Sequence, residues 1–253
     1  MKAVQITALF GGGEEGAAAR DMADLQWNVA DESALEAALR LAGGEGEVAV
    51  LTMGPFKLES LLKELAARGA GETALITDSV MAGADTHATA MALKAAAERL
   101  GPFDLILCGR RTIDGETGQV PGELAAALGL PCVSEVERIE ERDGRLTLFR
   151  RVEGGVQELQ ARWPLVISLC EYAYPLRLAN IMGIRRARMA PVKIFHAADL
   201  NLEPWDCGQA GSLTEVVSAE RKLPGLRCGE KETDLKRGTA RLFEMIEEVR
   251  GWL

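Results

Sequence analysis

The strongest constraint on the fold is a regular alternation of short apolar runs with amphipathic helical segments over the first 130 residues. Apolar runs predict strands, and apolar residues spaced three and four apart predict helices. The expected strands cover 3–10, 47–53, 73–77 and 104–109, and the expected helices cover 31–42, 55–69, 85–101 and 118–130. Strands that alternate with helices through short loops predict an α/β fold of three layers, with a parallel sheet between two layers of helices.

A different pattern follows this region. Alternating apolar and polar runs, with turn signals at Asp143-Gly144 and Gly154-Gly155, predict an antiparallel meander that leads into a buried strand at 165–169. From residue 201 the chain is irregular, before a terminal helix expected at 232–252. Long irregular segments on compact domains are usually functional. We therefore expect an α/β domain at 1–200 and, at 201–253, an arm and helix that wrap a partner.

Composition excludes several functions. A net charge of -9 over 253 residues leaves no basic surface for nucleic acid or for an anionic membrane. The chain has no run of 18 apolar residues, and its start lacks the apolar core of a signal peptide. The five cysteines are scattered without a C-x-x-C pair, and Cys108 and Cys170 end apolar strands. We expect a cytoplasmic protein with reduced cysteines and no membrane insertion.

A glycine-rich segment after the first strand raises the possibility of a dehydrogenase. Gly11, Gly13 and Gly16 match the G-x-G-x-x-G pattern of NAD-binding loops. Glu14 and Glu15, however, lie where a diphosphate requires amides and the positive end of a helix. The residue pattern therefore favours a surface turn.

The sequence also lacks the patterns of common catalytic and metal sites. Its two histidines are His87 and His196, and neither pairs by spacing with the residues of a hydrolytic triad or a metal site. We assign no catalytic residue and no metal ligand.

The loop at 109–120, GRRTIDGETGQV, is the best candidate for a binding site. Asp114 and Glu116 lie two residues apart, but nothing supplies the burial that separates the pKa values of a catalytic acid and base. Backbone amides around 118–120 open a helix, where they suit phosphate oxygens, and Thr117 or a neighbour is expected to cap that helix. The two acids then order the loop or accept from ribose hydroxyls. A capped turn without a ligand is the alternative.

Two further corners of the same form strengthen the nucleotide interpretation. TMGP at 52–55 and GADTHATA at 83–90 also place a glycine between a strand and a helix. Parallel strands bring such corners to one edge of the sheet, where α/β proteins bind their ligands.

Five segments, in order, resemble the beta subunit of electron transfer flavoproteins. NVADESALEAALRL at 28–41 resembles its Asn-Pro-x-Asp/Glu segment, and VLTMGP at 50–55 resembles its Gly-Pro corner. LILCGRRTIDGETGQVPGELAAALGLP at 105–131 is similar to its nucleotide loop. RLANIMGIRRARMAPVKIF at 177–195 is similar to its Leu-x-Asn-Ile-Met recognition loop followed by a basic strand, and RKLPGLRCGEK at 221–231 resembles its arm motif.

The resemblance implies a fold of the adenine nucleotide alpha hydrolase kind and a heterodimer whose alpha subunit carries FAD. Such proteins carry electrons between flavin dehydrogenases and a quinone oxidoreductase or ferredoxin. Housekeeping beta subunits hold a structural AMP, whereas electron-bifurcating ones hold a second FAD and take hydride from NADH. GADTHATA and IDGETGQV are closer to the bifurcating kind. The resemblance therefore implies FAD in this subunit, with AMP as the alternative.

Carried over residue by residue, the family's contacts fall on a defined set of positions. The cofactor contacts are Ala8, Asn28, Asp31, Met53, Asp85, Thr86, Thr89, Gly109, Arg110, Asp114, Gly115, Glu116, Thr117, Gly118, Gln119 and Val120. The contacts at Asp85, Thr86 and Thr89 belong to this set only if the bound cofactor is FAD. The recognition loop that docks the dehydrogenase falls on Leu178, Asn180, Ile181 and Met182.

Two segments depart from the family's pattern. LFGGGEEGAAARDMAD at 9–24 replaces a basic residue, a short apolar stretch and an aspartate, and EYAYPLRLANIM at 171–182 replaces the usual Asn-Glu-Pro-Arg-Tyr. Tyr174, Pro175 and Arg177 are the candidates to take over the second role. A nucleotide-binding regulator of the same fold is the alternative from another functional class.

Overall fold

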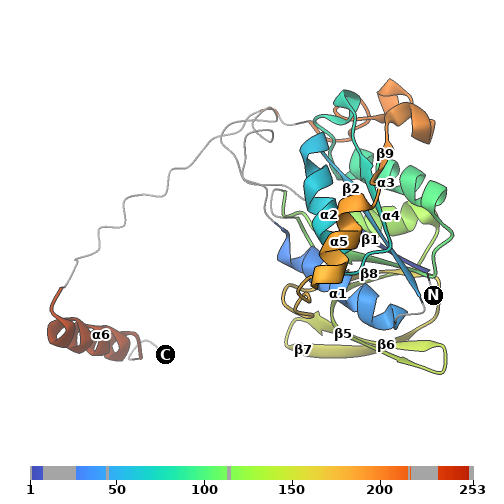
Figure 1. Ribbon diagram of the computed structural model, residues 1–253. Coiled ribbons are helices and arrows are strands. Elements are labelled where there is room, and N and C mark those ends of the chain that lie inside the picture. The colour runs from blue at the N-terminus through green and yellow to red at the C-terminus, as the bar shows by residue number, and fades with distance from the viewer. Residues whose placement is uncertain are drawn as a thin grey trace. The chain divides into compact units, whose positions relative to one another are not determined.

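The computed structural model describes residues 2–7, 27–43, 46–112, 115–215, 217 and 233–250. The chain divides into two units, Met1–Glu215 and Val216–Leu253. The first unit contains the sheet, and the described part of the second is mainly the helix α6, Leu235–Arg250 (Figure 1). No helix in the described part of the chain is long and apolar enough to cross a membrane. Several predictions lie outside the described residues, namely those at Ala8, Gly11, Gly13, Gly16, Asp114 and 221–231.

A nine-stranded sheet with the order β7-β6-β5-β8-β4-β1-β2-β3-β9 forms the centre of the first unit. The strands of its parallel part are β1 (Lys2–Thr7), β2 (Glu47–Met53), β3 (Glu72–Ile76), β4 (Leu105–Gly109), β8 (Leu165–Leu169) and β9 (Lys193–Phe195). The predicted meander follows as β5 (Cys132–Arg142), β6 (Arg145–Val152) and β7 (Gly155–Ala161). β5 is parallel to β8 but antiparallel to β6.

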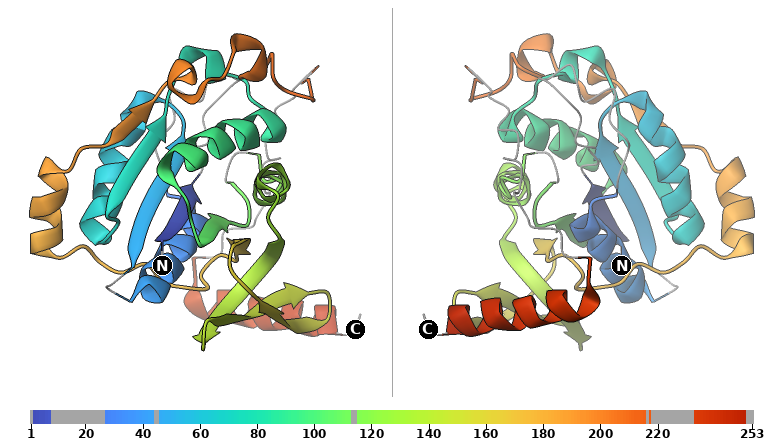
Figure 2. Two further views of the ribbon diagram at one scale, coloured as in Figure 1. Left: turned by 90° about the vertical axis from the view of Figure 1, so that its right-hand side faces the viewer. Right: turned by 90° about the vertical axis from the view of Figure 1, so that its left-hand side faces the viewer.

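Helices cover both faces of the parallel part of the sheet. They are α1 (Val29–Ala42), α2 (Glu59–Arg68), α3 (Thr86–Leu100) and α4 (Val120–Leu128). α1 and α2 pack on one face, and α3 and α4 pack on the other (Figure 2). The predicted α/β fold, a sheet with parallel strands flanked by helices, is confirmed.

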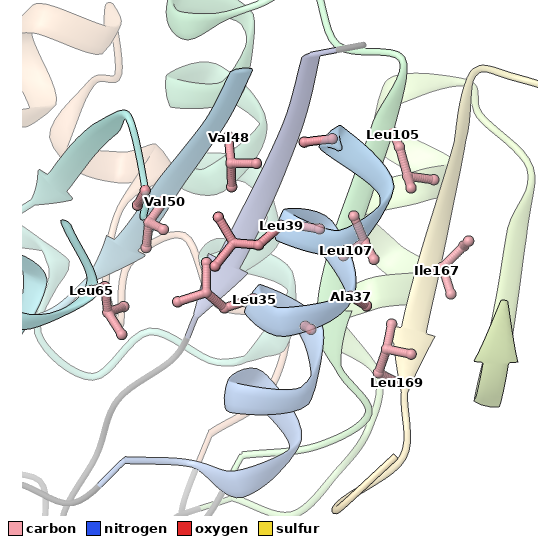
Figure 3. Close-up of a cluster of buried hydrophobic side chains, with 14 of the residues drawn as sticks. Leu35, Ala37, Leu39, Val48, Val50, Leu65, Leu105, Leu107, Ile167 and Leu169 are labelled. Carbon is pink, nitrogen blue, oxygen red and sulfur yellow. The ribbon is translucent and has the colours of Figure 1, made fainter. Parts of the chain in front are cut away.

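One hydrophobic core lies between α1 and the sheet. Figure 3 shows Leu35 and Leu39 of α1 next to the strand residues Val48, Val50 and Leu107. All five side chains are at most 9% exposed, so this face of the sheet is closed to water. Burial of such leucines contributes about 1.5–3 kcal/mol each and fixes the position of α1.

The strand order places the ligand-binding edge. From β1 the chain adds β2 and β3 on one side, and it then returns to add β4 on the other side of β1. Loops that follow neighbouring strands diverge at such a reversal, and they leave a crevice outside the carboxyl ends of the strands.

α1 begins earlier than the sequence predicts. The expected helix covers 31–42, whereas the helix begins at Val29 with Asn28 as its N-cap. The Oδ1 atom of Asn28 accepts from the Ala30 N–H at 3.4 Å, which is the usual role of an asparagine at this position.

The segment expected to form a recognition loop and a basic strand is mostly helical. Helix α5 (Ile181–Met189) carries Arg185, Arg186 and Arg188, and only Lys193–Phe195 forms the edge strand. Asn180 caps this helix, because its Oδ1 atom accepts from the Gly183 N–H at 2.7 Å. α5 packs on the outer side of α2 (Figure 2).

Candidate functional site

A cavity of about 570 Å³ opens at the carboxyl ends of β2, β3 and β4. Its lining comes from the three predicted corners and from the segment at 77–82 that precedes the second corner, and it includes residues from 53–55, from 77–89 and from 112–120. Thr214, far along the chain, completes the rim. The corners therefore meet at one sheet edge, as the strand–glycine–helix pattern predicts.

The predicted cofactor contacts fall into four groups. Those that line the cavity are Met53, Asp85, Thr86, Thr89, Gly115, Thr117, Gln119 and Val120. Those that line a small adjacent recess include Asp31, Gly109 and Gly118. Asn28, Arg110 and Glu116 line neither space: Asn28 and Glu116 contact Arg111 of the loop, and Arg110 contacts Glu171 outside it. Ala8 and Asp114 lie outside the described residues.

The start of α4 offers backbone amides at the edge of the cavity. The prediction was Thr117 or a neighbour, and the cap residue is Gln119, whose backbone N–H donates to Thr117 Oγ1 at 3.4 Å; no side chain caps the helix. Within the described part of the chain, the N–H groups of Thr117, Gly118 and Val120 meet no acceptor. Unpaired amides at a helix start bind anionic oxygens, so this corner suits a phosphate group.

Asn28 and Asp31 hold the loop after β4 in place. Asp31 Oδ1 accepts from the Gly109 N–H at 2.8 Å, and Asn28 Nδ2 donates to the Arg111 carbonyl at 2.7 Å. Both side chains are buried, with 3% and 5% of the residue exposed. Their hydrogen bonds fix the backbone that borders the recess.

Asp85 joins the start of α3 to the end of the first unit. Asp85 is the N-cap of α3, where its Oδ1 atom accepts from the Ala88 N–H at 2.9 Å. Its Oδ2 atom accepts from the N–H groups of Leu213 and Thr214 at 2.8 and 2.9 Å. Burial alone would raise the pKa of Asp85, but the hydrogen bonds from Ala88 and Thr214 together bring this pKa below its usual value.

Arg110 forms ion pairs inside the protein that sequence reasoning missed. Its guanidinium lies 3.0 Å from Glu135 and 3.0 Å from Glu171. Glu135 reaches this position from a bulge, because Val133 to Val136 of β5 lie opposite Ile167 to Leu169 of β8, which is one residue fewer. Glu135 has a φ of 60° in this bulge. No local signal marks either glutamate, since both pairs join residues distant in sequence.

Asp78 is a second residue that sequence reasoning missed. It follows β3 and lines the cavity. Hydrogen bonds from the backbone N–H groups of Ala197 and Val80 hold the pKa of its carboxyl below the usual value, against the opposing effect of burial. Its place after a parallel strand, like that of Gly54 after β2, is the signal that identifies it.

Cys108, which lines the recess, and Cys170 at the end of β8 are not activated nucleophiles. Burial raises the pKa of the Cys170 thiol to about 11 and that of Cys108 well above its usual value. Thiols protonated at neutral pH are poor nucleophiles. No group of His, Cys, Asp or Glu in the described ranges could hold a metal ion. These residues are suited to binding and orienting a ligand.

The predicted docking residues form an exposed apolar surface. Leu178, Ile181 and Met182 are 89%, 76% and 72% exposed, and Asn180 fixes the start of α5 between them. Large apolar side chains gathered on a surface are typical of protein interaction sites.

The fold and the site together define an open α/β protein with a cavity at the carboxyl ends of its parallel strands. Residues 15–200 match the electron transfer flavoprotein domain. The chain belongs to the electron transfer flavoprotein family and is related to its beta subunits. Members of this family function in electron transport, and their beta subunits pair with an alpha subunit. The predicted family is confirmed.

Three relatives illustrate this relationship. The beta subunit of the electron transfer flavoprotein of Thermoanaerobacterium thermosaccharolyticum is 38% identical over 193 residues, which cover 76% of this chain and 74% of that protein. The caffeyl-CoA reductase-Etf complex subunit CarD of Acetobacterium woodii is 36% identical over 75% of this chain and 73% of CarD. Protein FixA of Azorhizobium caulinodans is 41% identical over 75% of this chain and 70% of FixA.

Proposed function

We propose that this chain pairs with an electron transfer flavoprotein alpha subunit and binds FAD in the cavity at the carboxyl ends of β2, β3 and β4. In this role it passes electrons from NADH or an acyl-CoA-type dehydrogenase toward a quinone or ferredoxin system in the cytoplasm. The similarity to CarD, a subunit of a caffeyl-CoA reductase-Etf complex, supports this proposal.

The extent of the cavity is the observation that carries the choice of FAD. The lining continues from the loop before α4 to Asp85, Thr86 and Thr89 on the first turn of α3, which are the positions added when FAD replaces AMP. Its volume of about 570 Å³ lies within the range of about 300–1,000 Å³ that is typical of ligand pockets. A longer dinucleotide uses both ends of this space, whereas AMP uses only one.

The residues at each end suit different parts of the cofactor. The free amides of Thr117, Gly118 and Val120 would hold the phosphate oxygens of FAD. The hydroxyl groups of Thr86 and Thr89 would hydrogen-bond to polar groups of FAD that lie farther from these phosphates. Bound FAD would supply the redox chemistry, while the protein would provide binding, orientation and electrostatics. No residue of this chain acts as a covalent catalyst in this proposal.

Two surfaces would contact partners. Leu178, Ile181 and Met182 would dock the dehydrogenase, next to the exposed arginines of α5. The arm and helix at 201–253 would contact the alpha subunit. α6 supports this role because it exposes apolar side chains, namely Leu235, Leu242, Phe243, Met245 and Ile246.

The proposal is tested by mass analysis of the nucleotides released from the heterodimer coexpressed with its alpha subunit. Two FAD molecules per heterodimer support it, whereas one FAD and one AMP contradict FAD binding here. A Thr89→Leu substitution narrows the α3 end of the cavity, so most of the second FAD should be lost. His87→Leu is the matched control, because His87 is on the same helical turn but does not line the cavity. Equal losses in both variants would assign the second FAD to another site.

A further inference from the structure

Glu171 connects two loops that border different surfaces. Arg110 Nε donates to both carboxylate oxygens of Glu171 at 3.0 Å, and Arg111 Nε donates to Oε1 at 3.3 Å. The two arginines open the loop at 109–120, which we call the cavity loop. Glu171 opens the segment at 171–180 that carries Leu178, which we call the docking loop. One carboxylate therefore joins the two loops.

α1 makes a second connection between the same loops. At its start, Asp31 accepts from the Gly109 N–H of the cavity loop at 2.8 Å. Five residues later, Glu36 accepts from the backbone N–H of Arg177 at 3.2 Å and from its Nε at 2.9 Å. Ser33, between them, accepts from the Tyr174 N–H at 3.4 Å. A helix keeps the spacing of its residues fixed, so α1 holds both loops against one frame.

The two arginines differ in how far they face solvent. Arg110 is held by Glu135 as well as by Glu171, and its side chain is 22% exposed. Arg111 is 41% exposed and lines the recess beside the cavity together with Gly109. An anionic ligand that orders the cavity loop therefore also orders a guanidinium that contacts Glu171.

We propose, on the basis of the function proposed above, that Glu171 is a positioning residue that couples nucleotide occupancy of the cavity to the order of the docking loop. A bound nucleotide fixes the cavity loop, the two arginines then hold Glu171, and Glu171 fixes the chain that leads to Leu178. By thermodynamic linkage, docking of the dehydrogenase tightens nucleotide binding by the same factor.

The test is hydrogen exchange of the coexpressed heterodimer, followed in peptides that cover 105–112 and 171–180. Removal of the nucleotide from the unsubstituted protein should raise exchange at 171–180 about fivefold, in line with the upper range measured for partly exposed ion pairs. In Glu171→Gln, exchange should be high in both peptides, and at 171–180 it should no longer respond to the nucleotide. Glu171→Asp should restore part of the response, because it keeps the charge.

The matched control is Glu137→Gln, which removes a carboxylate that lies 3.7 Å from Arg151 on the meander. This variant should behave like the unsubstituted protein. An unchanged exchange at 171–180 on nucleotide removal, or a normal response in Glu171→Gln, would overturn the coupling. If the heterodimer releases no nucleotide, the proposed function fails instead. In that case the link between the loops is still tested, because it does not depend on a bound nucleotide. Unchanged exchange at 105–112 in Glu171→Gln would overturn it.

Discussion

At Gly109 the end of β4 passes so close to α1 that the site leaves no room for a side chain. A Cβ atom there would lie 2.8 Å from Oδ1 of Asp31 and 2.9 Å from its backbone nitrogen. Because the nearest atoms include backbone, they cannot move aside easily. The glycine therefore allows the Gly109 N–H to reach the Asp31 carboxylate.

We expect Gly109→Ala to lower the free energy of unfolding by about 1–3 kcal/mol, as is usual for overpacking in a tight site. Urea unfolding of the purified protein measures this loss. Gly122→Ala, in α4, is the control, because a Cβ atom there meets nothing within 4 Å and should stabilise the helix by about 0.5–1 kcal/mol. Equal stabilities of the two variants would show that the close approach to Asp31 costs nothing.

At the scale of single residues, the sequence indicated which polar residues lie near the site, but it did not indicate their hydrogen-bond and ion-pair partners. The family resemblance pointed to Asn28, Asp31 and Arg110, and all three lie around the loop after β4. What they contact could not be predicted, because Glu135 and Glu171 reach Arg110 only through the folded sheet. Whether the three also contact a cofactor stays a prediction.

Among the elements, α5 depends on a close contact with α2. A Cβ atom on Gly183 would overlap the carbonyl oxygen of Ala67, so the two helices pack together at this point without an intervening side chain. Small residues allow such close contacts between helices, and Ala187 of α5 is buried in the same cluster.

We expect Gly183→Ala to move α5 away from α2 and to loosen the docking surface that begins at Asn180. Hydrogen exchange of 181–189 should rise severalfold relative to the unsubstituted chain, although alanine favours helices. Ala190→Gly, at the end of the same helix, provides a control for general fraying. Slower exchange in Gly183→Ala would mean that helix propensity outweighs the contact with Ala67.

The elements themselves were predictable where local signals are strong. Periodicity located the strands and helices of the first 130 residues to within a few residues, and Asp143-Gly144 marked the first hairpin turn, where both residues have positive φ. The second turn uses Glu153 and Gly154, one residue earlier than predicted. The basic strand expected at the end of 177–195 is reduced to Lys193–Phe195, and most of the basic residues lie on α5. This expectation came from the resemblance, whereas Asn180 before an apolar residue is a helix-start signal in its own right.

On the scale of the whole molecule, several carboxylates join segments that are distant in sequence. Glu36 binds Arg177 of the docking loop, and Asp85 binds the backbone of Thr214. Burial raises the pKa of Glu36, but the hydrogen bonds from Arg177 and Arg40 together lower it by more than burial raises it. The net shift of this pKa is therefore downward. The pKa values of Asp78, Asp85 and Glu171 are also lowered.

We therefore expect the protein to lose stability in acid. A carboxyl whose pKa is lower in the folded state stabilises the fold above its unfolded pKa of about 4, and this stabilisation is lost as the pH falls through the folded value. Urea unfolding from pH 7 to pH 3 should show the decline, and Glu36→Gln should make it shallower. Glu98→Gln removes an exposed carboxylate paired within α3 and should leave the slope unchanged. Parallel curves for both variants would refute the role of Glu36.

The bulge in β5 has a consequence for a change in the length of this segment. From Val133 to Val136 the strand β5 has one residue more than β8 has from Ile167 to Leu169, so removing Ser134 would restore the regular spacing of a strand. Val136 would keep its partner Leu169, but Glu135 would lose the bulged backbone from which its carboxylate reaches Arg110. We expect deletion of this one residue to break the ion pair of Arg110 with Glu135 while the strand itself persists.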